Sequence, residues 1–398
     1  MSNPFEQARD FFMEGVRLHE AGRFDEAEER FQASLALVPG RASTLANLGA
    51  TRLKLGKAEE ALEVLEQALA SDADATDALQ HRAMALNMLG RHEEALADWI
   101  RLLRARPDHG ATWLWHGETL QNLERHEEAL VSYDTAVSRD PRLGQAWSRR
   151  GALLKDMGRL EEAAAAFREA IVHGDDPELN RYFLAALNGR DAPANPPLRY
   201  VEFLFDGYAE KFDEHLVQVL HYQAHRVLVE QLAALGRRFA SGLDLGCGTG
   251  LCGPLVKPMA DRLDGVDLSA NMLAKAKELG VYERLTRDDL VHYLSTTGCR
   301  YELALCADVF IYVGALEAVF DGVSRVLEPG GVFCFSVEPA PDEQAFVLQP
   351  SQRYAHSERY LRALAFGHGF EIRSMLRHPL REDQRQPIPG LYVCLSAA

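Results

Sequence analysis

The chain has 398 residues, of which 47% are apolar, so it is long enough for two or three domains with their own cores. Its formal net charge is −16 and the acidic excess runs through both halves, so neither nucleic acid nor an anionic membrane is an expected partner. There is no membrane-length apolar run, no signal-peptide pattern and no C-x-x-C pair among the six cysteines, so we expect a cytoplasmic protein with reduced thiols and no metal site.

The first half of the chain is an array of repeats. Residues 8–177 divide without gaps into five windows of 34 residues, which start at positions 8, 42, 76, 110 and 144. In every window the eighth residue is small, the twentieth is alanine and the twenty-fourth is large. In that order the residues are Gly15, Gly49, Ala83, Gly117 and Gly151; Ala27, Ala61, Ala95, Ala129 and Ala163; and Phe31, Leu65, Trp99, Tyr133 and Phe167. The pattern resembles the tetratricopeptide repeat (TPR), in which each window folds as a pair of helices.

Residue size explains how two helices can pack within each window. Small side chains at the eighth and twentieth positions let the helices cross closely, and the large side chain at the twenty-fourth is expected to fill the gap towards the next repeat. The resemblance implies an all-α solenoid whose concave groove holds a protein or peptide. The alternatives are that the array packs only against the second domain or mediates self-association into a homo-oligomer. Trp113 and Trp147 stand at the fourth position of their windows, where core packing is favoured over groove contacts.

A short segment separates the repeats from the second half. Residues 178–187 predict a helix that caps the last repeat, and residues 188–197 are rich in helix breakers, which is typical of a linker. We therefore assign residues 178–199 to a capping helix and linker, and residues 200–398 to a second domain.

The glycine-rich motif at residues 243–250 is the most informative part of the second domain. Its sequence, Leu-Asp-Leu-Gly-Cys-Gly-Thr-Gly, predicts a buried strand, a tight turn and the start of a helix. Residues 265–269 predict a second strand with Asp267 at its end, and together the two segments have the layout of a nucleotide-binding βαβ unit. Because the loop reads D-x-G-x-G-x-G rather than G-x-G-x-x-G, it resembles motif I of the class I S-adenosylmethionine (SAM)-dependent methyltransferases.

Strand and helix signals alternate through the rest of the domain, which indicates a parallel, doubly wound sheet. No helix is predicted between the last two strands, so we expect a hairpin with an antiparallel final strand, as in the seven-stranded class I methyltransferase sheet. The predicted strands are 242–245, 263–267, 284–287, 302–307, 331–337, 370–375 and 391–396, with helices at 269–279 and 315–327. The chain resembles the bacterial family of predicted methyltransferases with N-terminal TPR repeats. That resemblance implies an all-α TPR solenoid followed by a Rossmann-like α/β domain.

The resemblance also implies a SAM site beyond the carboxyl ends of the strands. Asp267 is expected to hold the ribose, and Asp244 to position the glycine loop and the methionine amine. Either Asp288 or Asp289, with Asp289 preferred, is expected to accept the adenine amino group. The backbone N–H of Leu290 is expected to face the adenine ring.

Apolar and aromatic side chains are expected to complete this cofactor site. Leu268 and Met272 would sandwich the adenine, although helix packing is an equal alternative for Met272. Tyr208 and Phe212 belong to a Y-A-x-x-F-D segment that resembles the N-terminal helix of small-molecule methyltransferases, and aromatic faces attract the SAM sulfonium cation. For Phe212, packing against the core is an equal alternative. The other expected cofactor contacts are Gly246, Cys247, Gly248, Gly250, Ala307, Asp308 and Val309.

Candidates for a methyl-acceptor site lie after the fifth predicted strand, in residues 349–357. Arg353 can clamp a carboxylate with two hydrogen bonds, and His356 is a candidate general base. Tyr312 or Tyr354 can orient the acceptor, and Phe310 is expected to contact it. The alternative for each is a structural role, and a carboxylate or thiolate acceptor needs no base at all.

Two other segments are less specific. Asn195-Pro196-Pro197-Leu198 resembles the N-P-P-[YFW] signature of amino-group methyltransferases, but its last residue is not aromatic and it follows no predicted strand. We therefore assign it to the linker. Residues 377–386 predict a polar loop that could form a lid over the site.

These patterns favour a SAM-dependent methyltransferase that acts on a small metabolite or natural product and releases S-adenosylhomocysteine (SAH), with the TPR array for recruitment or assembly. One alternative is a protein methyltransferase whose TPR groove holds the substrate protein. Another is a non-catalytic scaffold with a SAM-binding domain. The sequence does not select the accepting atom, because the fold serves many reactions.

Overall fold

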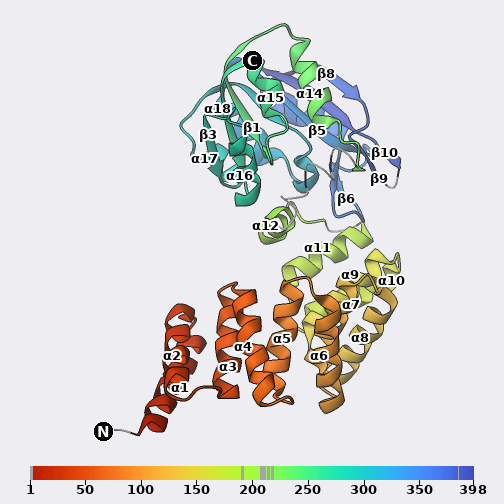
Figure 1. The fold of residues 1–398 in the computed structure, drawn as a ribbon. Helices are drawn as coiled ribbons and strands as arrows, with labels where there is room; N and C mark the ends of the chain where they lie inside the picture. Colours follow the sequence, from red (N-terminus) through yellow and green to blue (C-terminus); the bar gives the residue numbers. More distant parts are fainter. Residues whose placement is uncertain (1–2, 190–191, 207–211, 213–215, 217–218, 384) are drawn as a thin grey trace. The chain divides into compact units, whose positions relative to one another are not determined.

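The computed structural model describes residues 3–189, 192–206, 212, 216, 219–383 and 385–398. The chain divides into two compact units, Met1–Asn180 and Arg181–Ala398. The first unit consists of helices, and the second contains a sheet with helices on both faces (Figure 1). Within the described part of the chain, no helix is both long and apolar enough to cross a membrane.

Each repeat folds as a pair of helices, as the 34-residue period predicts. In repeats two to five, the first helix begins at the first residue of the window. The pairs are α1 (Pro4–Glu20) with α2 (Phe24–Leu37), α3 (Ala42–Lys54) with α4 (Ala58–Ser71), α5 (Thr76–Met88) with α6 (His92–Ala105), α7 (Gly110–Asn122) with α8 (His126–Arg139), and α9 (Gly144–Asp156) with α10 (Leu160–Val172). The following helix, α11 (Pro177–Asn188), covers the segment predicted as the capping helix.

The small residue at the eighth position and the large residue at the twenty-fourth are in close contact inside each helix pair. A Cβ atom on Gly49 would lie 2.5 Å from Cγ of Leu65, and one on Gly117 would lie 2.7 Å from Cε1 of Tyr133. The large residue at the twenty-fourth position therefore covers the eighth position of its own repeat, and Trp99 also packs against Trp115 of the next repeat, with ring centroids 5.4 Å apart. The alanines at the twentieth position are fully buried: Ala27, Ala61, Ala95, Ala129 and Ala163.

The tryptophans at the fourth position are not core residues. Trp113 and Trp147 are half-buried, and their indole N–H groups donate hydrogen bonds of 2.8 Å and 3.0 Å to the carbonyls of Pro107 and Pro141. They fasten the loop that precedes their own repeat, so the core prediction for them is wrong. The fully buried tryptophan is Trp99, at a twenty-fourth position.

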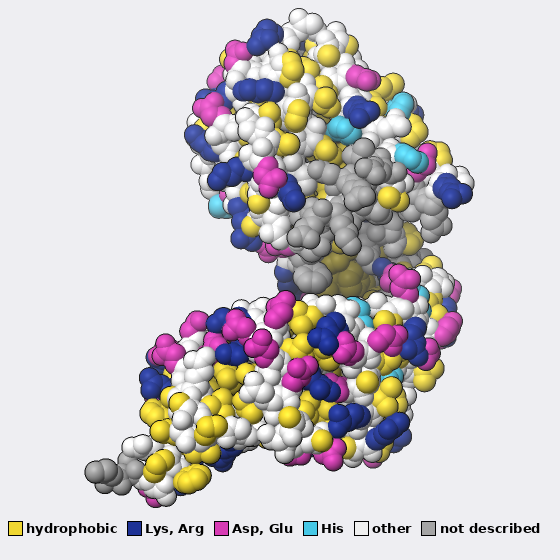
Figure 2. Space-filling view, viewed as in Figure 1, with side chains coloured by type: hydrophobic (Ala, Val, Ile, Leu, Met, Phe, Trp, Pro, Cys, Tyr) yellow, Lys and Arg dark blue, Asp and Glu magenta, His cyan; other side chains and the backbone are white. Residues whose placement is uncertain are grey.

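Charged residues of both signs alternate on the face of the first unit seen in Figure 2. An ion pair is present at the start of the second helix in four repeats. The pairs are Arg23–Glu26, Arg91–Glu94, Arg125–Glu128 and Arg159–Glu162. The glutamates also lie in the first helical turn, where negative charge complements the helix dipole.

The sheet of the second unit has the strand order β3-β2-β1-β4-β5-β11-β8. The strands β1 to β5 pair in parallel, whereas β11 runs antiparallel to both β5 and β8. The predicted parallel sheet, its terminal hairpin and its antiparallel final strand are confirmed. The strands are β1 (Phe239–Leu245), β2 (Ala260–Asp267), β3 (Arg284–Arg287), β4 (Tyr301–Cys306), β5 (Leu327–Ala340), β8 (Phe370–Arg377) and β11 (Leu391–Ala397).

Both faces of this sheet are buried, because alternate residues of a strand point to opposite sides. In β4, Leu303 and Leu305 pack in the hydrophobic cluster that contains α14 (Ala224–Ala233), while Ala304 and Cys306 pack with α18 (Glu317–Val326) on the other face. The carboxyl ends of the parallel strands thus form one edge of a two-sided core. The other helices are α12 (Leu198–Asp206), α15 (Gly253–Val256), α16 (Ala270–Glu278), α17 (Leu290–Thr296) and α19 (Glu358–Gly367), with short helices η2 (Lys257–Met259) and η3 (Phe310–Tyr312).

Two hairpins lie outside the strands that the sequence predicts. The strands β6 (Phe346–Leu348) and β7 (Tyr354–Ser357) pair with each other, and β7 extends the end of β5. The strands β9 (Arg381–Asp383) and β10 (Gln386–Ile388) pair with each other, and the predicted polar loop contains β9 and the first residue of β10. Ser357 does cap α19, since its hydroxyl accepts a hydrogen bond from the Tyr360 N–H.

Candidate functional site

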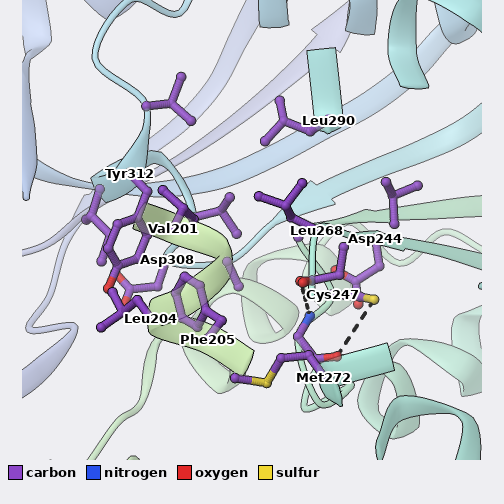
Figure 3. A pocket seen from close by; sticks show the side chains of 18 of the residues that line it. Val201, Leu204, Phe205, Asp244, Cys247, Leu268, Met272, Leu290, Asp308 and Tyr312 are labelled. Atoms are coloured by element: carbon purple, nitrogen blue, oxygen red, sulfur yellow. Dashed lines mark hydrogen bonds between the residues drawn. The ribbon is translucent and has the colours of Figure 1, made fainter. Parts of the chain in front are cut away.

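A cavity of about 980 Å³ lies at the carboxyl ends of β1 to β4, where open α/β sheets bind ligands. Residues after these strands line it together with α12, the turn between β6 and β7, and β9. In Figure 3, Asp244 and Cys247 lie on one side, whereas Asp308 and Tyr312 lie on the other, next to α12. We call the first side the acidic end, defined by Asp244, Asp267, Asp288 and Asp289. We call the second the arginine end, defined by Asp308, Tyr312, Arg353 and Arg381.

The glycine loop needs its glycines for two different reasons. Gly246 has a φ of +68°, and a Cβ there would lie 2.4 Å from Cγ2 of Val309, so this glycine permits close packing. Gly248 has a φ of +54°, and a Cβ there would meet no atom within 4 Å. Because Gly248 lines the cavity, the space beside it is a cradle for a ligand.

Asp267 connects this loop to β2. Its Oδ2 accepts a hydrogen bond of 2.8 Å from the Gly248 N–H, and its Oδ1 accepts one of 2.9 Å from the Ser269 N–H. Burial raises the pKa of Asp267, and the backbone hydrogen bonds act against that rise. Each carboxylate oxygen has a second lone pair, so Asp267 can hold the loop and still accept from a ligand hydroxyl.

Asp244 is the most buried carboxylate of the acidic end. It is 2% exposed, and its Oδ2 accepts a hydrogen bond of 2.7 Å from the hydroxyl of Tyr282, which the sequence did not single out. Burial raises the pKa of Asp244 to about 7, and the neighbouring charge of Asp267 acts in the same direction. A cationic ligand would stabilise the charged form of this carboxyl group.

The two acids after β3 also line the cavity. Asp289 caps α17, because its Oδ1 accepts from the N–H groups of Val291 and His292 at 2.9 Å and 3.0 Å. Asp288 lies 2.8 Å from Nδ1 of His292, a histidine that is exposed. Both acids therefore hold their segment in place, and the choice between them as a ligand contact stays a prediction.

The predicted apolar contacts at the acidic end are brought together. The lining residues include Cys247, Leu268, Met272 and Leu290, with Leu268 between the two sides of the cavity in Figure 3. Met272 is 1% exposed and also lines the cavity, so it contributes both to the packing of its helix and to the cavity wall. Ala307, Val309 and Phe212 line the cavity as well. Gly250 is absent from the lining, and Tyr208 lies outside the described residues.

The arginine end contains a buried ion-pair cluster that the sequence did not reveal. The guanidinium group of Arg381, in β9, is 2% exposed and donates to both carboxylate oxygens of Asp308, at 3.1 Å and 2.9 Å. Its other terminal nitrogen donates to Glu338, at the end of β5, and Gln349 donates to the same carboxylate at 2.8 Å. Burial raises the pKa of Asp308, while Arg381 and Arg353 act to lower it. Asp308 has a φ of +58°, so this cluster holds its backbone in a rarely used conformation.

Arg353 and Tyr312 stand beside this cluster. Arg353 is half-buried in the turn between β6 and β7, and Tyr312 belongs to η3 after β4; both line the cavity. Burial raises the pKa of Tyr312, and the positive charge of Arg353 opposes the rise. The ring of Tyr312 also meets that of Phe205, in α12, edge-on with centroids 5.1 Å apart.

Three predicted acceptor residues lie elsewhere. His356 is fully buried outside the cavity lining, with Nε2 2.9 Å from the carbonyl of Gly314, and burial lowers its pKa to about 4. Tyr354 is fully buried and donates to the carbonyl of Pro193, and Phe310 is part of the core below the sheet. The placement does not support general-base or acceptor-contact roles for these residues, which pack the structure behind the cavity.

Other cavity residues come from the segment predicted as linker. Asn195, Pro196 and Leu198 line the cavity, and the carbonyl of Ala194 accepts hydrogen bonds of 2.9 Å from the N–H groups of Gly314 and Ala315. This segment is therefore fixed to the loop after β4 and leads into α12. Only the resemblance of residues 195–198 to a methyltransferase signature could have drawn attention to it.

α12 covers the cavity with an apolar face. Val201, Leu204 and Phe205 line the cavity from this helix, as Figure 3 shows. Its polar groups are tied to the rim: Arg287 pairs with Glu202 at 2.6 Å, and Asn271 donates to the carbonyl of Asp206 at 3.0 Å.

Comparison with known protein families agrees with the two units. Residues 243–333 match the family described as "Methyltransferase domain", and residues 15–74, 46–111 and 114–178 match families described as "Tetratricopeptide repeat". The chain is 30% identical over 122 residues to a malonyl-[acyl-carrier protein] O-methyltransferase of Enterobacter lignolyticus, which covers 29% of this chain and 48% of that protein. It is 26% identical over 137 residues to a sterol 24-C-methyltransferase of Gibberella zeae, which covers 32% of this chain and 33% of that protein.

Solved structures with similar parts include a magnesium protoporphyrin IX methyltransferase from Synechocystis PCC 6803 with bound SAH, at 18% identity. That match covers 50% of this chain and 99% of the other, with a TM-score of 0.40. Another is MamA from Desulfovibrio magneticus RS-1, at 17% identity over 42% of this chain and 94% of the other, also with a TM-score of 0.40. Scores this low do not contribute to the assignment, and the chain spans about half or less of the two curated relatives named above. The family matches establish that the chain joins an array of tetratricopeptide repeats to a methyltransferase domain.

Proposed function

We propose that the second unit binds SAM at the acidic end of the cavity and transfers its methyl group to a small molecule bound at the arginine end. The observation that carries this proposal is the open cradle at Gly248, whose N–H is held by Asp267 beside three further carboxylates. SAM carries a sulfonium and an ammonium group, and a cavity end lined by carboxylates attracts such a cationic ligand. The methyltransferase-domain match at residues 243–333 supports the same ligand.

In this proposal each group of the acidic end has a separate task. Asp267 accepts hydrogen bonds from the ribose hydroxyls, and Asp244 pairs with the ammonium group of the methionine part. Asp288 or Asp289 accepts from the adenine amino group, between Leu268 and Met272. The methyl group then faces the arginine end, beside Asp308.

SAM supplies an activated methyl group, so the protein has to align an acceptor and exclude water. The apolar face of α12, with Val201, Leu204 and Phe205, serves both purposes because it forms one wall of the cavity. The side chains that face the arginine end hold the acceptor in line with the methyl group. No step requires the buried His356.

Calorimetric titration of the purified full-length protein with SAH tests the cofactor site. Asp267→Ala is expected to weaken binding at least tenfold, because it removes a charged acceptor for the ribose hydroxyls. Asp261→Ala is the matched control: it lies on the same strand, outside the cavity lining, with a 67% exposed side chain. SAH binding by Asp267→Ala that equals binding by the control would contradict the assignment, provided that both variants unfold at similar temperatures.

A protein acceptor is the second candidate, and the repeat match over residues 15–178 favours it, since TPR solenoids hold protein segments in their groove. The two candidates differ in the size of the molecule that receives the labelled methyl group. The protein is incubated with methyl-labelled SAM and cell extract, and the products are separated by size. Label in the low-molecular-mass fraction supports a small acceptor, whereas label confined to macromolecules supports the second candidate.

A further inference from the structure

The charges of the cavity are unevenly distributed. The carboxylates that line it at the ends of β1, β2 and β3 belong to the acidic end, whereas both of its lining arginines, Arg353 and Arg381, belong to the opposite end together with one carboxylate, Asp308. A cation is therefore favoured on one side, and an anion on the other. If the cofactor occupies the acidic end, as proposed above, the arginines face its partner in the reaction.

Arg381 is already neutralised by the protein. It donates to the carboxylates of both Asp308 and Glu338, and all three side chains are nearly buried. Its Nε, however, has no hydrogen-bond acceptor among the described residues, although the atom is buried and the residue lines the cavity. A buried donor without a partner costs about 1–3 kcal/mol, so an oxygen of a ligand or water would stabilise it. Arg381 is thus a structural cross-link with one donor left for a ligand oxygen.

Arg353 is in a different position. Among the residues that the structure describes, no carboxylate lies within salt-bridge distance of its guanidinium group, and its positive charge acts on the neighbouring neutral Tyr312. The turn that carries it is held in place, because the backbone carbonyl of Gln352 accepts a bond of 2.6 Å from Tyr182 and its side chain accepts one of 2.8 Å from Tyr200. The negative charge nearest to Arg353 is that of Asp308, which already forms an ion pair with Arg381. A half-buried arginine that is fixed in position without a carboxylate at salt-bridge distance is suited to bind an anion.

The surrounding walls are apolar. Val201, Leu204 and Phe205 from α12 line the cavity, and so do Ile311 and Val313 from the segment after β4. The cavity volume of about 980 Å³ lies at the upper end of the range for small-molecule sites, so a second molecule fits beside the cofactor. An acceptor that fills this end would bury hydrocarbon against α12 while its charged group reaches Arg353.

We propose, on the basis of the function proposed above, that the methyl acceptor is an apolar carboxylic acid whose carboxylate binds Arg353 and Tyr312. A planar carboxylate matches the paired N–H groups of a guanidinium, and its oxygens can also reach the unpartnered Nε–H of Arg381. The apolar part of the acid packs against α12. Arg353 is then the residue that selects anionic acceptors over neutral or cationic ones.

The test compares three probes of equal length: octanoate, octanol and octylamine. Each is titrated calorimetrically into the full-length protein saturated with SAH. Octanoate is expected to bind at least tenfold more tightly than the other two. In Arg353→Gln its affinity should fall by about tenfold to a hundredfold, because a charge-assisted hydrogen-bonded pair is lost, while octanol binding stays the same. Arg353→Lys should recover part of the loss, since it restores the charge but not the paired donors.

Arg359→Gln is the matched control, because Arg359 is an exposed arginine in α19 outside the cavity lining. It should bind octanoate like the unaltered protein. Equal affinity for octanol and octanoate, an unchanged octanoate affinity in Arg353→Gln, or no octanoate binding at millimolar concentration would each overturn the inference. SAH binding by Arg353→Gln shows that the variant is folded. If the unaltered protein failed to bind SAH, the proposed function would fall instead, and this inference with it.

Discussion

The acidic end and the arginine end of the cavity differ in how the chain builds them. The acidic end takes its polar groups from consecutive loops between Asp244 and Leu290, where each acid lies at or just after the end of a strand. The arginine end combines Asp308 with Glu338, Arg353 and Arg381, which come from four separate segments. Local geometry therefore dominates at one end, and long-range ion pairing dominates at the other.

The strongest test of this contrast is Arg381→Met. The substitution keeps much of the side-chain volume but leaves the carboxylates of Asp308 and Glu338 buried without their cation. Breaking a buried ion pair in this way costs about 3–5 kcal/mol, so the free energy of unfolding by urea should fall by that amount.

Arg377→Met provides the control for that measurement. Arg377 also forms an ion pair, with Glu358, but its side chain is 67% exposed, so its loss should cost no more than about 1 kcal/mol. Adding Glu338→Gln to Arg381→Met should recover part of the lost stability. Equal effects of the Arg381 and Arg377 substitutions would show that the buried cluster does not hold the arginine end together.

A second, smaller effect should separate two glycines of the acidic end. Gly246→Ala places a methyl group 2.4 Å from Val309 at a positive φ, and this overpacking should lower the free energy of unfolding by about 2 kcal/mol or more. Gly248→Ala meets no atom within 4 Å, so only backbone strain of about 1–2 kcal/mol is expected.

For ligand binding we expect the opposite order, with the larger effect from Gly248→Ala and the smaller from Gly246→Ala. Gly248→Ala fills the cradle and should abolish detectable SAH binding, which calorimetry measures directly. In the double variant Gly246→Ala, Val309→Ala the stability should recover in part, because the clash is removed while the strain of the positive φ remains. Retention of SAH binding by Gly248→Ala would show that the cradle is not the cofactor site.

The smallest expected effect is a pH dependence from Asp244. Its pKa of about 7 means that the carboxyl group is partly protonated near neutral pH, and the cationic ammonium group of SAH favours the ionised form. Affinity should therefore rise between pH 6 and pH 8, by less than tenfold per pH unit, and then level off. Below pH 7, binding should release protons, so the measured enthalpy will depend on the ionisation enthalpy of the buffer. Asp244→Asn should remove this dependence; its persistence would assign the released proton to another group.

The sequence predicted the arrangement of helices and strands well because their signals are local. The 34-residue period follows from contacts inside each helix pair, such as Gly49 with Leu65, and these residues are 16 positions apart in every repeat. The glycine loop is equally local, since Gly246 and Gly248 encode their own backbone conformations. The predicted parallel sheet and the terminal hairpin followed from the same alternation of short signals.

The sequence was a poor guide where the position of a side chain depends on segments far away in the chain. His356 resembles a catalytic base in the sequence, but β7 lies beside β5, and the ring is buried next to Gly314. Arg381 resembles Arg377 and Arg385 in a polar stretch, and no local signal separates the buried one from its neighbours. Tyr282 was not selected, although its hydroxyl holds Asp244.

By itself, the sequence determined the two architectures and the glycine loop with its two acids, Asp244 and Asp267, because turn geometry and helix packing are set by residues near one another in the chain. Only the tertiary structure decided which charges meet. The pairing of Arg381 with Asp308 and Glu338 depends on a hairpin near the C-terminus reaching the ends of β4 and β5. A buried charge such as that of Arg381 needs opposite charges beside it to offset the cost of its removal from water. Arg353, which is half-buried, is the cavity arginine without a carboxylate at salt-bridge distance among the described residues.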